Sequence, residues 1–277
     1  MKEILRKAQT YQFTSLKYVD IDLIQANTDD DLIITTNDAI VFCNKTHDDY
    51  NIFWAAKTCE AFCNAFQELK INMSYLLAKG PRRLYIEFVD PQFVSILENM
   101  GFVIVSHFVD YWNENISTWN CERKTDNGIV LRNAKEEDYT DVSLVTNMCK
   151  DQSRGFHGEE VDFFKEWNEE PNSCILLAEI KGQIAGVCLI RVYGFDNDKG
   201  PVIWIRQLAV NPNYQNQGIG FFLLEQSLLW GKCKGAKRSF LAVDKQNTIA
   251  INLYMKSGFQ CFDEIGQINM AFNNKQM

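Results

Sequence analysis

The chain has 277 residues and a mass of 32.0 kDa, with 28 Lys and Arg against 36 Asp and Glu and a formal net charge of −8. This length suggests two domains, and 46% hydrophobic residues are enough for packed cores. A pI near 5.0 argues against nucleic-acid binding, which needs a basic face, and favours cationic or amine-bearing partners.

The nine cysteines are odd in number, show no C-x₂-C spacing and lie mostly in apolar runs. We therefore expect reduced, buried thiols in a cytoplasmic protein and no metal, with a redox or metal role as the alternative. The N-terminus has no signal-peptide pattern, and no charge-free apolar run reaches ~18 residues. The sequence thus predicts a soluble protein without a membrane span.

In chain order, the first clear strand covers 103–112, where apolar and polar residues alternate. The polar stretch 121–128 follows and contains the turn dipeptide Asn127-Gly128. We place a domain boundary near 122–128, which gives a first domain over 1–125 and a second over 129–277.

The second half alternates between strands and helices. We expect strands at 129–133, 174–180, 183–193, 202–210 and 239–243, helices over 134–150, 221–233 and 248–256, and a strand-like end at 258–272. This order predicts a mixed α/β fold, with a sheet flanked by helices.

A glycine-bearing turn, Gln215 to Gly220, lies between the strand at 202–210 and the next helix. Gly218 and Gly220 allow the backbone to approach a ligand closely, and the N–H groups that open the helix favour an anion such as a diphosphate. An ordinary connecting loop is the alternative. The dinucleotide motif G-x-G-x-x-G fails because Leu223 stands at its third glycine.

The pattern LAV-NP-x-Y-Q-N-Q-G-I-G, followed by N-x-x-A-x-x-L-Y-x-x-x-G-F, resembles the GNAT N-acetyltransferase family over residues 128 to about 272. The resemblance implies a mixed, mostly antiparallel central sheet and acetyl-CoA as co-substrate. The residues that it implies for cofactor binding are Leu208, Ala209, Val210, Asn216, Gln217, Gly218, Ile219, Gly220, Phe221 and Asn247.

The resemblance also implies two catalytic groups. The backbone N–H of Val210 would stabilise the oxyanion, and Tyr254 would be the general acid that protonates the departing thiolate. The alternative for Tyr254 is a tyrosine that only packs in the core.

The sequence departs from the family at the general base. Trp204 and Ala242 occupy the strand positions where relatives often carry glutamate. The remaining candidates are carboxylates near strand ends and in loops, a loop histidine, or proton loss to water; the residues are Asp244, Glu179, Asp196, Asp198 and His157.

An acidic run covers the region from which this family takes acceptor contacts. Its members are Asp141, Asp151, Glu159, Glu160, Asp162, Glu166, Glu169 and Glu170. Such a run usually forms a solvated helix face, but at an acceptor site it would suit a cationic amine, either a small molecule or a peptide.

The first half resembles a degenerate second GNAT domain. With an offset of 157, residues 84–102 align with 241–259 without a gap, and Gly101-Phe102 meets Gly258-Phe259. Ala61 and Cys63 then fall opposite Gly218 and Gly220, and Leu97 falls opposite Tyr254. We therefore expect a tandem protein whose first domain is a scaffold without its own phosphate turn or acid; a chance similarity of a strand-helix unit is the alternative.

The leading hypothesis is an acetyl-CoA-dependent N-acetyltransferase that acts by direct attack of a primary amine in a ternary complex. The alternative is a non-catalytic acyl-CoA-binding or regulatory module, because the usual carboxylate base is missing. The sequence does not indicate the acceptor's identity, the acyl-chain preference or an oligomeric state.

Overall fold

The computed structural model describes residues 1–25, 30–46, 49–117, 128–150 and 152–273, which form two compact units. Unit 1 contains residues 1–107 and the chain from 267 onward, and unit 2 contains residues 108–266. Apart from Gly128, the expected boundary at 122–128 lies outside the described residues. The compact units instead divide inside two strands, at 107/108 and at 266/267.

Unit 1 is a sheet with the strand order β2-β3-β4-β5-β12, in which β12 spans Gln260–Asn273, and β1 pairs with β4. Its elements are α1 (Lys2–Ala8), β1 (Phe13–Thr14), β2 (Leu32–Thr35), β3 (Ala39–Lys45), β4 (Tyr50–Ala56), α2 (Cys59–Ala78), β5 (Arg83–Val89) and α3 (Val94–Glu98).

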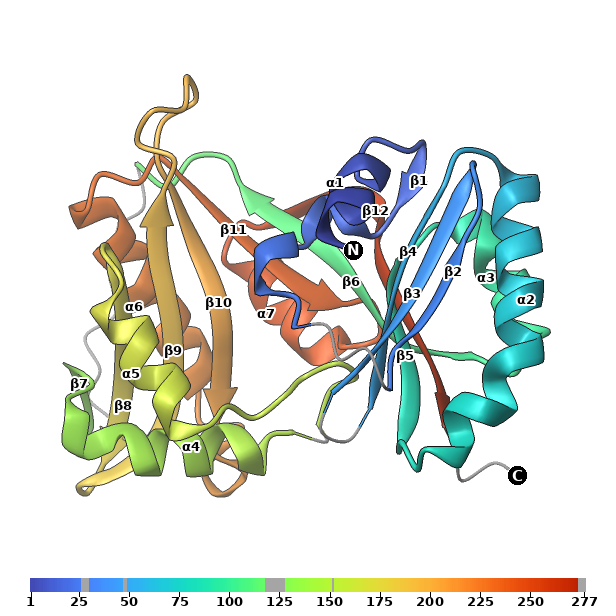
Figure 1. The fold of residues 1–277 in the computed structure, drawn as a ribbon. Helices are drawn as coiled ribbons and strands as arrows, with labels where there is room; N and C mark the ends of the chain where they lie inside the picture. The colour runs from blue at the N-terminus through green and yellow to red at the C-terminus, as the bar shows by residue number, and fades with distance from the viewer. Residues whose placement is uncertain (26–29, 47–48, 118–127, 151, 274–277) are drawn as a thin grey trace. The chain divides into compact units, whose positions relative to one another are not determined.

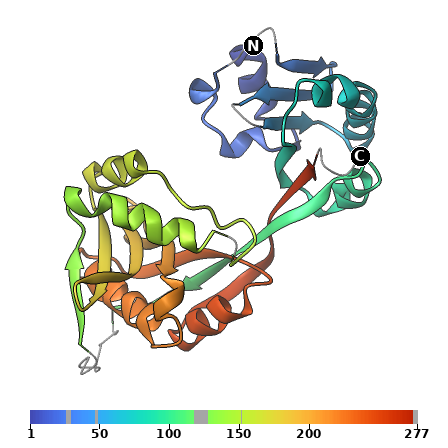
Figure 2. The same cartoon turned by 90° about the horizontal axis from the view of Figure 1, so that it is seen from below.

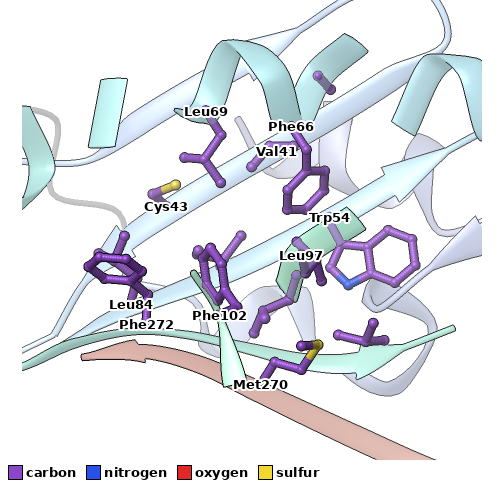
Figure 3. Packing of buried hydrophobic residues seen from close by; sticks show 14 of the residues in the cluster. Val41, Cys43, Trp54, Phe66, Leu69, Leu84, Leu97, Phe102, Met270 and Phe272 are labelled. Atoms are coloured by element: carbon purple, nitrogen blue, oxygen red, sulfur yellow. The ribbon is translucent and has the colours of Figure 1, made fainter. Parts of the chain in front are cut away.

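The largest core of unit 1 lies between its sheet and α2 (Figure 1). Val41 and Trp54 of the sheet meet Phe66 of α2 in this core, as Figure 3 shows. Met270 and Phe272, from the far end of the sequence, complete it. Burial of these side chains from both ends of the sequence favours the assembled unit.

Unit 2 is a sheet with the order β6-β11-β10-β9-β8-β7. Its elements are β6 (Val103–Asn113), β7 (Ile129–Asn133), α4 (Tyr139–Met148), α5 (Val161–Glu169), β8 (Ser173–Ile180), β9 (Gln183–Tyr193), β10 (Val202–Val210), α6 (Ile219–Cys233), β11 (Arg238–Asp244), α7 (Thr248–Lys256) and β12 (Gln260–Asn273).

Helices cover both faces of the sheet of unit 2. Figure 2 shows α4 and α5 on one face and α6 and α7 on the other. One core forms beneath α6 and α7, and a second forms beneath α4 and α5. Strand β10 supplies both cores, because alternate side chains of a strand point to opposite faces.

Two strands each serve both units. Residues 108–113 of β6 pair with β11 in unit 2, whereas residues 268–273 of β12 pair with β5 in unit 1. In unit 1, β5 therefore pairs with a strand from the end of the sequence. In unit 2, β11 pairs with a strand that follows the first half of the sequence.

The strands and helices expected for the second half are present, but α4 is shorter than the expected 134–150 and α5 was not predicted. β7, β10 and α7 match their predicted ranges, and α6 begins two residues before the expected 221. Among the strand pairs described, β4 with β5 and β10 with β11 are parallel and the others are antiparallel. This is the mixed, mostly antiparallel sheet that the family resemblance implied.

Two further expectations concern the whole chain. The eight cysteines in the described part of the chain are free. Among the same residues, no helix combines the length and apolarity that a membrane span requires.

Candidate functional site

The two central strands of unit 2 separate and leave one edge of β10 open. β10 and β11 pair in parallel only from Val202 with Arg238 to Trp204 with Phe240. Beyond that point, β10 continues to Val210 with β9 on its other side, and Figure 1 shows β10 and β11 diverging. The open edge offers main-chain groups to an extended ligand, as a sheet edge does to an added strand.

The hydrogen-bond pattern identifies which groups face the open edge. The Asn211 N–H donates to the Ala185 carbonyl oxygen of β9 at 3.0 Å. Because the direction alternates along a strand, Leu208 and Val210 point their N–H and C=O groups away from β9. Ala209 differs from its predicted role, since its main-chain groups face β9. Leu208 and Val210 remain as main-chain partners for a ligand.

The glycine turn follows directly after this edge. Asn216 and Gly218 both have positive φ, at 60° and 81°, and Gly218 is the N-cap of α6. A Cβ at Gly218 would meet no atom within 4 Å, whereas one at Gly220 would contact Leu253 at 3.3 Å. The left-handed conformation therefore explains the glycine at 218, and close packing explains the one at 220.

The turn presents the start of α6 as an anion site. The first helical hydrogen bond runs from the Phe222 N–H to the Gly218 carbonyl oxygen at 3.0 Å, so the N–H groups of Ile219 and Gly220 precede the first turn's hydrogen bonds. Ile219 is buried in the core and offers only its main chain. The helix dipole and these N–H groups favour a phosphate.

Close packing fixes the position of α6. A Cβ at Gly186 of β9 would lie 2.8 Å from Leu223 and 2.9 Å from Ile219, and one at Gly231 of α6 would lie 2.6 Å from Ile203. Helix and sheet therefore touch through glycine at both ends of α6, which fixes the turn relative to the open edge.

Tyr254 lies in the core beneath α6 and α7, with 8% of its surface exposed. Within the described chain, its hydroxyl makes no hydrogen bond. Burial, together with the nearby Cys188 thiol, raises the pKa of Tyr254 above its usual value. The group is therefore protonated throughout the neutral range and free to donate to a ligand atom.

Asn247 has a structural role that the sequence analysis did not assign. It is the N-cap of α7, and its Oδ1 accepts a hydrogen bond from the Ala250 N–H at 3.1 Å. A contact from Asn247 to a cofactor would therefore come from its Nδ2.

The candidate bases are engaged or distant. Asp244, 1% exposed at its side chain, pairs with Arg154, and Glu179 pairs with Arg132 at 2.6 Å. Asp196 and Asp198 lie in the β9–β10 loop, which precedes the start of β10. His157 is exposed, and its carbonyl oxygen accepts a hydrogen bond from Gln207 at 2.9 Å.

A β-bulge in β10 adds two residues to the candidate site that the sequence did not indicate. Pairing with β9 passes from Ile205 directly to Gln207, so Arg206 is the extra residue. Arg206 and Gln207 both contact the segment between α4 and α5, although neighbours in a regular strand point to opposite faces. No local sequence signal marks this bulge.

Unit 1 has the same parallel pair, but its own chain occupies the open edge. β4 pairs with β5 only from Tyr50 to Ile52, and β1 then pairs with β4 at Ala55 and Ala56. β3 covers the other edge of β4 along its whole length, so β1 lies on the edge that faces β5.

Unit 1 also lacks the glycine turn. Residues 57–58 connect β4 to α2, whereas residues 211–218 connect β10 to α6. Ala61 and Cys63 lie inside α2, and the turn is lost because the connection is shorter. Leu97 is fully buried at the place of Tyr254, and Gly101 and Gly258 share positive φ, as the predicted repeat requires.

Comparison with known proteins agrees with this geometry. Residues 133–259 match the model of the acetyltransferase (GNAT) family. This part of the chain is a GNAT domain. An N-alpha-acetyltransferase from Sulfurisphaera tokodaii is 29% identical over 140 residues, which span 47% of this chain and 79% of that protein. An acetyltransferase from Yersinia pestis is 27% identical over 49% of this chain and 90% of its own. These relatives support an acyltransferase activity.

Two solved structures show the fold of both units. A GCN5-related N-acetyltransferase from Sphaerobacter thermophilus aligns over 99% of this chain and 85% of its own, with a TM-score of 0.62 and 13% identity. A tandem GNAT protein from the clavulanic acid biosynthesis pathway aligns over 88% of this chain and 82% of its own, with a TM-score of 0.60 and 10% identity. The predicted tandem GNAT architecture is confirmed.

Proposed function

We propose that residues 129–277 transfer an acetyl group from acetyl-CoA to a primary amine by direct attack in a ternary complex. The observation that carries this proposal is the open edge of β10, which ends directly at the left-handed turn before α6. A pantetheine chain would pair with Leu208 and Val210, and a diphosphate would bind the first N–H groups of α6. The empty space around Gly218 fits the close approach of a phosphate.

The Val210 N–H stabilises the negative charge that develops on the carbonyl oxygen during attack. Main-chain donors suit this role because they are fixed before the reaction, and one such donor contributes ~2.7–4 kcal/mol. The Val210 carbonyl, which lies in the next peptide unit, accepts hydrogen bonds from Cys149 and Gln215 that help to fix this residue.

Tyr254 donates its proton, or a hydrogen bond, to the leaving sulfur. Burial raises the pKa of Tyr254, which weakens it as an acid in isolation. Burial acts on a thiol in the same direction, as Cys188 beside it shows, with a pKa raised to about 12. Burial therefore raises the pKa of the proton donor and that of the leaving thiol together, so proton transfer between them stays feasible.

The amine must lose a proton, and the described carboxylates near the open edge are engaged in ion pairs. We propose that the acceptor enters as the neutral amine or gives its proton to water. An alkyl amine with a pKa near ~10.4 is then more reactive as the pH rises.

The alternative is a non-catalytic acyl-CoA-binding module, which the engaged carboxylates favour. Thiol release from acetyl-CoA with a panel of primary amines separates the two readings. Amine-dependent release supports the transferase. CoA binding without release, for every amine and up to pH 9, would leave only the binding module.

The acceptor is a small molecule or peptide with a primary amine. The name of the relative from Sulfurisphaera tokodaii, an N-alpha-acetyltransferase, supports an α-amino group. A cytoplasmic location and the absence of a metal remain predictions from the sequence.

A further inference from the structure

A short segment between α4 and α5 crosses the gap between β11 and β10. We call residues 154–159 the strap. At one end, Arg154 donates from Nε and Nη2 to Asp244 Oδ1 of β11, at 3.2 and 3.1 Å. At the other end, Glu159 Oε1 accepts from Arg206 Nη2 of β10 at 2.8 Å. Both contacts lie beyond the point where the strands separate, so the strap covers the gap on the α4–α5 face.

The strap is also held along its length. The Gln207 Nε2 donates to the His157 carbonyl oxygen at 2.9 Å, and the Ser143 hydroxyl donates to the Glu159 carbonyl oxygen at 2.7 Å. A Cβ at Gly158 would lie 2.2 Å from Asn147 Oδ1, so the strap also touches α4 closely. An acceptor amine that approaches from this face must pass the strap.

In both ion pairs of the strap, the arginine is the more exposed member. The side chain of Asp244 is 1% exposed and that of Arg154 is 30% exposed, and Glu159 and Arg206 are 20% and 30% exposed. The Arg206 guanidinium also lies 5.2 Å from the centre of the Phe163 ring, which orients it. Each guanidinium keeps N–H groups that make no hydrogen bond within the described residues.

Gln207 adds a polar atom without a partner. The residue is 6% exposed, and its Oε1 is buried with no hydrogen-bond donor among the described residues. It lies between the two arginine contacts, at the bulge. A buried amide oxygen of this kind accepts from an N–H donor, such as the amine of an acceptor that enters beneath the strap.

The acidic run that suggested a cationic acceptor does not face the gap in this way. Glu159 is neutralised by Arg206, Glu170 pairs with Arg191, and Asp151 lies outside the described residues. The other members are exposed on α4 and α5 or beside them: Asp141, Glu160, Asp162, Glu166 and Glu169.

We propose that the acceptor carries an anionic group, a carboxylate or a phosphate, beside its primary amine. Arg206 and Arg154 bind the anionic group, and Gln207 Oε1 accepts a hydrogen bond from the amine. Guanidinium groups bind both anions through paired N–H donors. This inference rests on the proposed acetyltransferase function.

The test compares amines that differ only in charge, with the full chain and saturating acetyl-CoA. The pairs are ω-amino acids and their carboxamides, and O-phosphoethanolamine and ethanolamine, with spermidine as the cationic amine. Values of kcat/KM are corrected for the fraction of free amine. We expect the anionic member of at least one pair to exceed its neutral partner by about tenfold or more. The pair that shows this excess identifies the anion as carboxylate or phosphate.

Variants connect the preference to the arginine. Arg206→Gln should bring the anionic-to-neutral ratio to within about twofold of one, with no change in the KM of acetyl-CoA. Glu159→Gln, which frees the guanidinium, should preserve or raise the ratio. The matched control is Arg191→Gln, at an arginine whose partner is the exposed Glu170, and it should leave the ratio unchanged.

Three outcomes would overturn the inference: a preference for spermidine, equal rates within every pair, or an anionic preference that survives Arg206→Gln. Thiol release in any of these cases would leave the transferase function standing. No release with any amine would instead overturn the proposed function itself, so the two failures are distinguishable.

Discussion

Ser15 and Trp54 exchange hydrogen bonds in both directions. The Ser15 N–H donates to the Trp54 carbonyl oxygen at 2.9 Å, and the Trp54 N–H donates to Ser15 Oγ at 3.0 Å. In unit 2, the corresponding edge of β10 is open. The segment beginning at β1 therefore takes, in unit 1, the place where unit 2 would bind a pantetheine chain.

From this contact we expect one acetyl-CoA per chain. Titration calorimetry of the full chain should give a stoichiometry near one, because β1 fills the edge of β4 and the connection to α2 lacks a phosphate turn. Gly218→Val should strongly weaken this single binding event. A second binding event that persists in this variant would show that unit 1 binds CoA after all.

The glycine turn gives a prediction with a matched control. In Gly218→Val, side-chain atoms would stand where the diphosphate approaches, and we expect the Kd of CoA to rise by about 100-fold or more, about 2.7 kcal/mol. Gly235→Val is the control, since Gly235 also has positive φ and open space around its Cβ. Both variants should lose ~1–2 kcal/mol of stability from backbone strain.

Calorimetry and thermal unfolding on both proteins separate the two effects. If Gly235→Val weakens CoA binding as much as Gly218→Val does, the loss comes from lower stability and not from a blocked turn. Gly220→Val should also weaken binding, through pressure on Leu253 and Val210 rather than through φ.

Tyr254→Phe tests the proposed acid. The substitution keeps the ring and its packing near Phe259, with ring centres 6.1 Å apart, and removes only the hydroxyl. We expect kcat to fall by roughly 10²–10⁴, with an unchanged KM for acetyl-CoA, in steady-state assays at saturating amine. Tyr139→Phe removes a similarly buried hydroxyl from α4 and should keep kcat within about threefold of wild type. Full kcat in Tyr254→Phe would reduce Tyr254 to a packing residue.

The raised pKa of Tyr254 predicts a pH effect on stability. The unfolded chain ionises this tyrosine near pH ~10, whereas the folded chain keeps it protonated, so its contribution is complete below pH ~10 and is lost as the pH rises. Between pH 10 and 11, wild type should lose about 1 kcal/mol more unfolding free energy than Tyr254→Phe. Denaturant titrations at each pH measure this difference, and identical slopes for the two proteins would contradict the buried, protonated state.

Local signals account for what the sequence predicted well. Asn211 and Pro212 end β10 where the pattern changes, and Lys181 and Gly182, both with positive φ, form the tight turn between β8 and β9. The partners of β6 and β12 could not be predicted, because an alternating strand pattern is the same whichever neighbour the strand joins. The same limit applies to the placement of β1 against β4.

The sequence indicated the turn and Tyr254 of the candidate site, but not the strap. The turn at 215–220 and Tyr254 carry recognisable spacing, whereas the strap contacts depend on a bulge that adds one residue to β10. Helix α5 could have been predicted, since Phe164 and Trp167 are three residues apart and both are buried. The residues of this helix were interpreted only as part of the acidic run.

Because β6 and β12 each serve both units, the unit whose synthesis begins first is completed last. Unit 2 is one continuous stretch, residues 108–266, and all of it has been made before residue 267 leaves the ribosome. Unit 1 is begun first, yet Met270 and Phe272 of its core are made after all of unit 2. Unit 1 must therefore wait, with an uncovered strand edge at β5, while unit 2 is translated. A nascent chain of the first 250 residues would expose this edge of β5. A chaperone that binds β-strand edges would therefore have the longest time to bind at this edge.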